Sequence, residues 1–346
     1  MTLDFLHSKK YLRFKSFKRG YISFLIFLGL IFFTLILELV VNSRPMVVKY
    51  NNHYYFPTYG SYLPGRVFGL DYDYETNYRD LKKKFRESSE NWLILPVVPY
   101  NPYEADLKDS ASPPYAPDFQ ERHYVGTDIS GRDIVARLSY GFRTAIYFGL
   151  ILLLAEYIIG VTLGIAMGYF GGKFDLLMQR LIEVWSNLPF LYVIMIVSSF
   201  VIPSFFLFVA IMVFFSWINM TWYMRTAAYK ERARDYVASA KVVGVSDFRI
   251  ITRHILPNVV SLLVTFMPFT LAGGIVSLTS LDYLGFGLPP PTPSWGELLS
   301  QGTANLQAIW IVSSVVICMV SLLIVVTFIG EAVREAFDPK KYAHYE

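Results

Sequence analysis

The chain has 346 residues, of which 54% are hydrophobic, 17% are aromatic and only 17% are charged. A soluble domain usually carries about 25% charged residues. The aromatic content argues against disorder, and the single cysteine excludes a disulfide scaffold. A formal net charge of +4 is too small to indicate nucleic-acid binding. The composition therefore predicts a membrane protein.

Six apolar stretches are long enough to cross a bilayer, because a helix of about 20 apolar residues spans about 30 Å of hydrocarbon. They cover residues 21–41, 144–169, 181–202, 205–224, 259–281 and 306–329. Pro203 and Ser204 separate the third stretch from the fourth so narrowly that we expect a tight hairpin there. The sequence thus predicts an all-α membrane protein with six transmembrane helices.

The distribution of Lys and Arg predicts the orientation. Segment 1–20 is basic, and the apolar core that follows it is longer than the 7–15 residues typical of a cleavable signal, so residues 21–41 are interpreted as an uncleaved anchor. Short flanks rich in Lys and Arg stay in the cytoplasm, and the loop at 225–257 is also strongly basic. We therefore expect the amino terminus and the tail, residues 330–346, to be cytoplasmic.

Segment 42–143 is predicted to form a domain outside the cytoplasm, because loops of this length translocate largely regardless of charge. It contains nine of the 18 prolines and a cluster of tyrosines between residues 50 and 78. Such spacing favours extended, turn-rich structure over long helices. We expect an irregular or β-structured insertion between the first helix and the membrane core, residues 144–329.

An enzymatic function has one candidate pair of residues. His123 and Asp128 have the spacing of an acyltransferase HxxxxD motif, in which a histidine oriented by the aspartate acts as a general base. Two residue types at one spacing recur by chance, so a membrane acyltransferase is kept as an alternative only. Met167 and Phe174 replace the Gly and the Ser or Thr that a phosphate loop needs, so no nucleotide is expected on this chain.

Few ionisable residues interrupt the apolar stretches, although an ion-coupled secondary transporter would need them at depth. Glu156 lies about halfway along the second stretch, where it is either a pathway residue or a carboxylate that faces the helix bundle. Gly273 and Gly274 provide a possible flexible point in the fifth stretch, and Asp282 follows it. These four residues are the candidates for a pathway or gate.

Gly160, Gly164 and Gly168 form a GxxxGxxxG stripe in the second stretch. Small residues at every fourth position allow two helix backbones to approach closely. Helix packing is the preferred interpretation, and substrate contact is the minor alternative.

The basic loop between the fourth and fifth stretches has the pattern of two short helices. The first runs to Gly244, a natural helix end, and the second begins at about Asp247, a plausible N-cap. Pro257 marks the entrance to the fifth stretch. Such a helix is suited to a groove in a partner protein, although a basic amphipathic helix that rests on anionic lipid has a similar pattern.

This loop resembles the EAA loop of ABC importer permeases, whose pattern is Glu-Ala-Ala, three residues, Gly, and then Leu-Pro. Ala240, Gly244 and Pro257 match the pattern. Ala238 stands where the family has Glu, and Ser239 replaces the first Ala. The residues that the resemblance assigns to coupling with an ATPase are Arg234, Asp235, Ala238, Ser239, Ala240, Gly244, His254 and Pro257.

Two further motifs resemble the C-type permease subunit of dipeptide and oligopeptide importers, and the outer segment and tail are most similar to its YejE branch. One motif is Gly126-Thr-Asp-Ile-Ser-Gly-Arg-Asp133, followed by Arg137, and the other is Ser280-Leu-Asp-Tyr-Leu-Gly-Phe-Gly-Leu288. In the first, Asp128 with Arg132 and Asp133 with Arg137 are four residues apart, so a helical backbone would pair them. This motif is assigned to the periplasmic face, with charge pairing preferred over substrate contact.

The resemblance implies a type I importer permease with a MetI-like core, in the inner membrane of a bacterium, that forms half of a pathway for peptides or microcin C-type compounds. It implies as partners a second permease of the YejB or OppB type, two cytoplasmic ABC ATPase domains that bind ATP and magnesium, and a periplasmic substrate-binding protein. The chain itself is not expected to be an enzyme or to bind a cofactor or metal.

Overall fold

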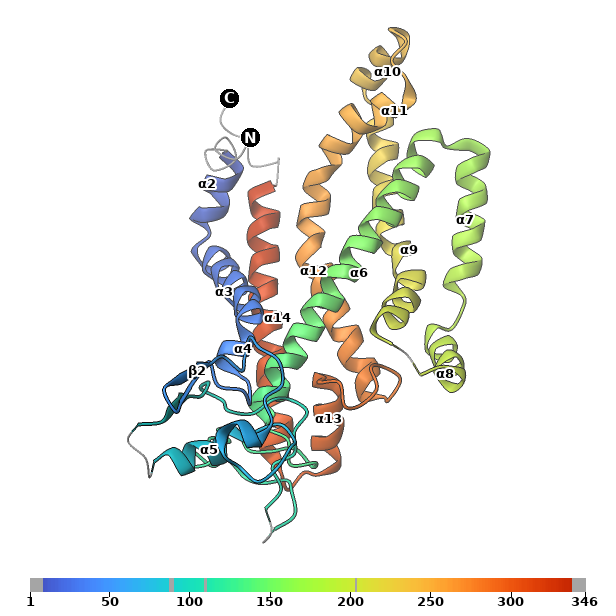
Figure 1. Cartoon of the computed structure of the whole chain (residues 1–346). Coiled ribbons are helices and arrows are strands. Elements are labelled where there is room, and N and C mark those ends of the chain that lie inside the picture. Colours follow the sequence, from blue (N-terminus) through green and yellow to red (C-terminus); the bar gives the residue numbers. More distant parts are fainter. Residues whose placement is uncertain (1–8, 87–89, 109–110, 203, 338–346) are drawn as a thin grey trace.

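The computed structural model describes residues 9–86, 90–108, 111–202 and 204–337. Long helices form most of the molecule, and a small domain with a β-sheet lies at one end of them (Figure 1). Helices α10 (Asp235–Val242) and α11 (Asp247–Ile250) lie at the opposite end. We call these two ends the sheet end and the loop end.

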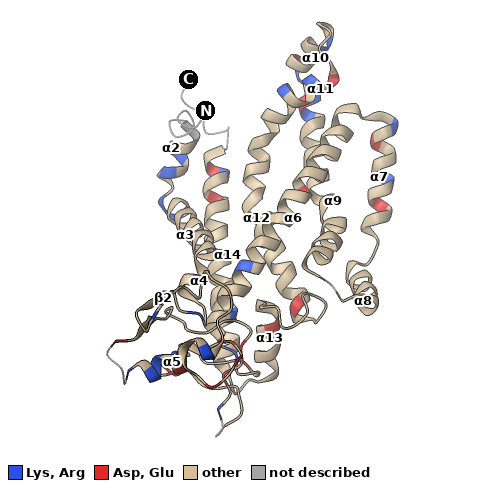
Figure 2. Cartoon of the chain, in the orientation of Figure 1, with Lys and Arg blue, Asp and Glu red and all other residues tan. Residues whose placement is uncertain are grey.

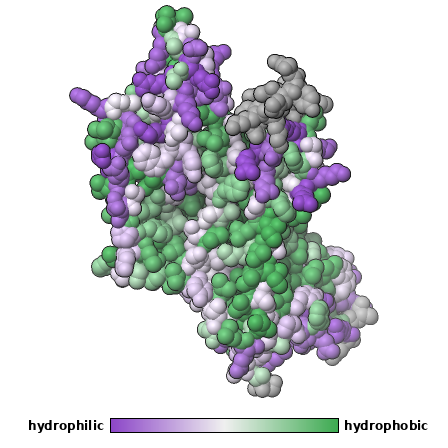
Figure 3. Space-filling model, turned by 180° about the vertical axis from the view of Figure 1, so that it is seen from behind, coloured by the Kyte–Doolittle hydropathy of each residue, from purple (hydrophilic) through white to green (hydrophobic). Residues whose placement is uncertain are grey.

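Five of the described helices are long and apolar enough to cross a membrane. They are α3 (Lys18–Leu35), α6 (Ile134–Phe170), α9 (Phe205–Arg232), the segment Asp247–Tyr283 that contains α12 (Leu256–Tyr283), and α14 (Ile309–Phe337). Seen from behind, apolar side chains cover much of the middle of the molecule between more hydrophilic ends (Figure 3). The shorter helices are α2 (Lys9–Ser16), α4 (Leu37–Val40), α5 (Tyr78–Phe85) and α13 (Trp295–Ala304), with single turns at η1 (Gly65–Phe68) and η2 (Ile251–Ile255).

The third predicted helix is broken. Instead of one helix over 181–202, α7 (Gly172–Ser186) and α8 (Phe190–Phe200) meet at an angle of 66°, and only together are they long and apolar enough for one more span. Pro189 directly precedes α8; it has no N–H to donate to the preceding turn, and it disfavours helical backbone at Leu188. The prediction of one uninterrupted helix was therefore wrong.

The predicted hairpin after α8 lies partly outside the described residues, because Pro203 is not among them. Ser204 begins the fourth helix as its N-cap: the hydroxyl accepts a hydrogen bond from the N–H of Leu207 at 3.3 Å. A serine in this position satisfies one of the N–H groups that the first turn of a helix leaves unpaired.

Two helices extend beyond the apolar stretches that predicted them. Helix α6 begins at Ile134, not at residue 144, because the Asp133 carboxylate accepts a hydrogen bond from the N–H of Ala136 at 2.8 Å and so caps a polar first turn. Residues 134–143, which were predicted to belong to the outer segment, thus form the first turns of α6. Helix α14 continues to Phe337, well into the segment 330–346 that was assigned to the tail.

Helices α6 and α9 pack with their backbones in close contact. A Cβ atom on Gly164 would lie 2.5 Å from the carbonyl oxygen of Thr221, and one on Gly168 would lie 2.4 Å from that of Arg225. Gly160 meets the same helix. Only glycine permits this approach, so the geometry agrees with the packing role that the GxxxGxxxG stripe predicts.

A continuous apolar core joins the long helices to α8 and α13. Its members include Ile146, Phe148, Ile194, Phe208, Ile275, Leu298 and Ile311. Because α13 belongs to this core, the segment after α12 is anchored to the bundle at the sheet end.

The domain before α6 contains three short antiparallel strands in the order β2 (His53–Tyr55), β1 (Val47–Tyr50) and β3 (Trp92–Ile94). Val48 of the central strand pairs with Tyr55 on one side and with Leu93 on the other. Helix α5 closes a small core against this sheet through Leu81 and Phe85. Much of the remaining described domain consists of turns and extended segments.

Candidate functional site

The loop end is formed by the segment between α9 and α12. Helices α10 and α11 extend beyond the neighbouring long helices (Figure 1). Val237, Ile250 and Ile255 are buried in a cluster that also contains Ile165 and Tyr169 of α6. These apolar contacts give the loop a fixed position relative to α6.

Helix α10 ends where the glycine predicts. Gly244 has φ +82°, a left-handed conformation that favours glycine. Its N–H donates to the carbonyl oxygen of Lys241 at 3.0 Å, and the N–H of Val245 donates to that of Ala240 at 3.0 Å. These bonds satisfy carbonyl groups at the end of the helix and turn the chain toward α11.

The predicted N-cap of α11 was wrong by one residue. Ser246 precedes the helix, whereas Asp247 is its first residue. The Asp247 carboxylate instead accepts a hydrogen bond from the hydroxyl of Tyr169 on α6. This bond is a second link between the loop and α6.

Three large apolar side chains at the tip of the loop are exposed. Val242, Val243 and Phe248 are 87%, 81% and 78% exposed, and the cationic residues Lys241 and Arg249 lie beside them. We call Val242, Val243 and Phe248 the apolar tip. Exposed apolar groups that charged residues surround are typical of protein interfaces. The sequence reading missed these residues, although three large apolar side chains in a basic loop were the available signal.

The predicted coupling residues have different environments. Ala238 and Ser239 are exposed on α10, and Ala240 is half-buried. Arg234 and Asp235 are exposed at the start of that helix.

The last two predicted coupling residues, His254 and Pro257, follow the apolar tip in the sequence. His254 is half-buried in η2, and Pro257 is exposed in the first turn of α12.

Tyr236, which the sequence reading missed, braces the loop against both flanking helices. Its hydroxyl donates to the carboxylate of Glu231 on α9 at 2.6 Å and accepts from the side-chain amide of Asn258 on α12 at 3.0 Å. Tyr236 thus links α10 to the ends of two long helices.

A buried charge cluster lies at the sheet end. Arg132 Nε lies 2.7 Å from Asp128 Oδ2, and its Nη2 lies 2.9 Å from Glu297 Oε1. Arg137 is fully buried; it pairs with Glu297 and lies 3.5 Å from Asp128 Oδ2. The cluster joins the segment before α6 to α13, and Glu297 was not among the predicted residues.

Only one of the two conditional ion pairs in this motif forms. Asp128 pairs with Arg132 although the backbone there is a turn and not a helix. Asp133 does not pair with Arg137, because its two carboxylate oxygens cap α6 and bind His123.

The geometry does not favour the acyltransferase alternative. His123 Nδ1 lies 2.8 Å from Asp133 Oδ2, and Nε2 lies 3.1 Å from Asp106 Oδ2. Both ring nitrogens are thus engaged by carboxylates other than that of Asp128, which belongs to the arginine cluster. His123 is buried and has no free nitrogen for general-base catalysis.

His123 instead makes the free energy of unfolding depend on pH. Burial lowers its pKa, but the hydrogen bonds to Asp106 and Asp133 outweigh that effect and raise the pKa to about 9. In the unfolded chain the pKa is about 6.5. The contribution of His123 to the free energy of unfolding is therefore fully present below about pH 6.5. It is lost as the pH rises through about 9, and the free energy of unfolding then falls by at most about 1.4 kcal/mol per pH unit.

We expect His123→Gln to flatten this dependence, with the wild type losing thermal stability between pH 6.5 and 9 relative to the variant. Melting temperatures of the purified chain across that range provide the measurement. Parallel curves for the two proteins would show that His123 is neutral in the folded protein.

The gate candidates do not form one cluster. Glu156 is buried midway along α6. Gly274 packs against α6, where its Cβ would lie 3.3 Å from a methyl carbon of Leu152, whereas Gly273 is exposed. Asp282 accepts hydrogen bonds from the Ser294 hydroxyl and from the N–H of Leu288, so it shapes the turn before α13.

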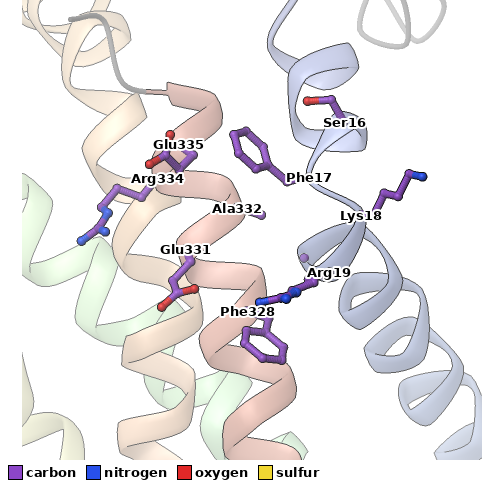
Figure 4. A pocket seen from close by; sticks show the side chains of 10 residues that line it. Ser16, Phe17, Lys18, Arg19, Phe328, Glu331, Ala332, Arg334 and Glu335 are labelled. Carbon is purple, nitrogen blue, oxygen red and sulfur yellow. The ribbon is translucent and has the colours of Figure 1, made fainter. Parts of the chain in front are cut away.

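A hollow of about 670 Å³ lies at the loop end between α3 and α14. Arg19 and Glu331 both line it, and Arg19 points from α3 toward α14 (Figure 4). Gly20 closes one side, because its Cβ would lie only 2.1 Å from that of Ala332. None of the predicted site residues lines this hollow.

Comparisons with known proteins identify the family. The family described as "binding-protein-dependent transport system inner membrane component" matches residues 160–341. The "inner membrane ABC transporter permease protein YejE" of Escherichia coli K12 is 40% identical over 97% of this chain and 98% of its own length. The "peptidoglycan transport system permease protein YejE" of Agrobacterium fabrum is 38% identical over 96% and 93%. The "dipeptide transport system permease protein DppC" of Haemophilus influenzae is 33% identical over 70% and 83%.

A solved structure shares the fold of the core. A chain of the MetNI methionine ABC transporter in an inward-facing conformation has a TM-score of 0.50, at 13% identity, over 58% of this chain and 96% of that chain. The full-length similarity to the two YejE proteins carries the assignment. This chain therefore belongs to the family of ABC-transporter permeases for peptides that includes YejE, DppC and OppC, and it is a multi-pass protein of the inner membrane.

Proposed function

We propose that this chain is one of two permease subunits of an ATP-driven importer, and that the loop end is where an ATPase subunit binds. The observation that carries the proposal is the apolar tip, Val242, Val243 and Phe248, exposed on a loop that Tyr236 ties to both flanking helices. An apolar surface of this kind gains free energy when a partner covers it.

Ala238, at the position where the family has Glu, is exposed beside Ser239. Because this carboxylate is missing, apolar and backbone contacts would contribute most of the binding to the ATPase. Arg234, Asp235, Ala240, Gly244, His254 and Pro257 then position the helix for this contact. In this proposal ATP and magnesium are bound by the partner and not by this chain.

The proposed orientation places the loop end in the cytoplasm and the sheet end outside. Lys and Arg residues are present on α2 and on the loop between α9 and α12 (Figure 2), as the positive-inside rule requires of short cytoplasmic segments. Both termini then lie in the cytoplasm, and the domain of residues 42–133 faces a substrate-binding protein.

A second permease of the YejB or OppB type would complete the pathway. Helices α7 and α8 present exposed apolar side chains such as Val184, Tyr192 and Phe200. Lipid or a second subunit must cover these side chains in the membrane. The cargo that fits the relatives' printed names is a peptide or peptidoglycan fragment, with microcin C-type compounds as the narrower possibility.

Transport in this proposal is a shift between inward-open and outward-open packings of the helices. ATP-driven closure of the ATPases favours one packing only if the loop contacts differ between the two states. The brace by Tyr236 and the fixed contact between the loop and α6 transmit that difference into the bundle.

The test is co-purification from mild detergent after expression of the chain together with candidate ATPase and permease subunits from the same genome. We expect two ATPase subunits and a second permease to purify with the wild-type chain. A chain that purifies alone under conditions that preserve another importer of this class would contradict the proposal.

A further inference from the structure

A basic hollow of about 300 Å³ opens beside α5 in the sheet-end domain. Side chains from α5 and from the segment around residue 122 line it. This segment lies far from α5 in the sequence, so the fold itself creates the hollow. Figure 2 shows the basic residues of α5 in this domain.

Helix α5 divides its residues between two faces. Tyr78, Leu81 and Phe85 are buried against the sheet. Arg79 and Lys82 line the hollow, as does Arg86 directly after the helix. Spacings of three and four residues place these cations on one side, so they converge on the hollow.

Arg79 is already neutralised. It pairs with Glu104, lies 3.7 Å from an oxygen of Asp106, and stacks over the Tyr100 ring at 4.3 Å. Arg79 therefore lines the hollow, but its charge is already paired with carboxylates.

Lys82, Arg86 and Arg122 also line the hollow. None of them has an ion pair within residues 9–86, 90–108, 111–202 and 204–337. Burial lowers the pKa of Lys82, and repulsion from the positive charges of Arg122 and Arg86 lowers it further. A bound anion would relieve this repulsion.

Arg122 has a strained backbone conformation. Its φ of +64° is uncommon for a residue other than glycine, and its guanidinium donates to the carbonyl oxygen of Pro96 at 3.4 Å. Strained backbone of this kind persists only where the surrounding structure imposes it, and it concentrates at binding sites.

The carboxylates on the rim do not neutralise the three cations. Asp80 lies 3.5 Å from Lys83, and the Asp106 carboxylate binds His123 and faces Arg79. Glu121 also lines the hollow and is exposed. The lining therefore keeps an excess of positive charge.

We propose that this hollow binds the oxyanion group of a small ligand, either a carboxylate or a phosphate, between Lys82, Arg86 and Arg122. Arginine and lysine bind such groups through short charge-assisted hydrogen bonds. The hollow is concave and contains three convergent cations, which favours a small ligand over the acidic surface of a protein. The inference does not depend on transport, so it can fail or succeed independently of the proposed function.

The experiment measures binding to the full-length chain in phosphatidylcholine nanodiscs by isothermal titration calorimetry. The probes are inorganic phosphate, an N-acetylated dipeptide with a free carboxylate, and the same dipeptide amidated at its carboxyl end. We expect saturable binding of at least one of the first two probes, weaker binding at high salt, and no binding of the amidated dipeptide. Phosphate binding alone identifies a phosphate ligand, and dipeptide binding identifies a carboxylate ligand.

The decisive variant is Lys82→Gln/Arg86→Gln/Arg122→Asn, in which asparagine tolerates the left-handed backbone. We expect it to bind the probe at least about tenfold more weakly. Lys49→Gln/Arg66→Gln/Lys84→Gln removes three cations that do not line the hollow and is expected to bind as the wild type does. Equal affinity of wild type and the first variant, or no saturable binding of either anionic probe, would overturn the inference. Binding only of an acidic partner protein would do so as well.

Discussion

Replacing Arg137 with alanine is expected to lower the free energy of unfolding by about 3–5 kcal/mol, because removal of one partner leaves buried charges uncompensated. Arg137 is fully buried, donates to the carbonyl oxygen of Pro102 at 2.9 Å, and pairs with Glu297 on α13. Its loss also removes a cation 3.5 Å from Asp128. Thermal unfolding of the purified chain in detergent measures the effect as a lower melting temperature.

Arg180→Ala is the matched control. Arg180 and Glu183 form an ion pair in which both side chains are largely exposed, so its loss is expected to change stability by less than about 1 kcal/mol. The double variant Arg137→Met/Glu297→Leu should lose less stability than the two single variants lose together. The reason is that it removes both charges and leaves neither of the two buried without its partner. Equal melting temperatures for Arg137→Ala and Arg180→Ala would show that the buried cluster does not stabilise the fold.

Replacing Val243 with aspartate is expected to reduce uptake at least about tenfold while the chain still folds, since a charge buried without a partner in an interface costs more than about 1.4 kcal/mol. The side chain is 81% exposed, and exposed substitutions usually change stability by less than about 0.5 kcal/mol. The measurement is peptide uptake by cells that express the whole transporter, with the amount of chain in the membrane determined in parallel.

Val97→Asp makes the same chemical change at the sheet end, where Val97 is 60% exposed. It should leave ATPase binding intact. Normal uptake by the Val243→Asp transporter, with the ATPases still co-purifying, would exclude the apolar tip as the docking surface.

Local features of the fold were predictable because they depend on a few neighbouring residues. Gly244 ends α10 since only its left-handed conformation allows the turn, and the glycine stripe of α6 marks where another backbone passes. The break before α8 was equally local, and Pro189 was its visible signal. Long apolar stretches outweighed this signal in the prediction of helix boundaries.

The charge clusters depend on residues far apart in the sequence. Spacing suggested that Asp133 pairs with Arg137, but the fold brings Glu297 to Arg137 and Asp106 to His123. These partners are 160 and 17 residues apart, so a pattern of four-residue intervals carries no information about them. The apolar tip was missed for a different reason: exposure is a property of the folded loop and not of its composition.

Helix α6 has a consequence for how the two ends of the molecule communicate. It is one uninterrupted helix of 37 residues, about 55 Å long. Tyr169 near one end binds Asp247 of the loop, whereas Asp133 and Arg137 at the other end hold the sheet-end domain and α13. One continuous helix thus connects the loop to the sheet-end domain, so a tilt of α6 at the loop would displace the opposite domain without a relay of intermediate side chains.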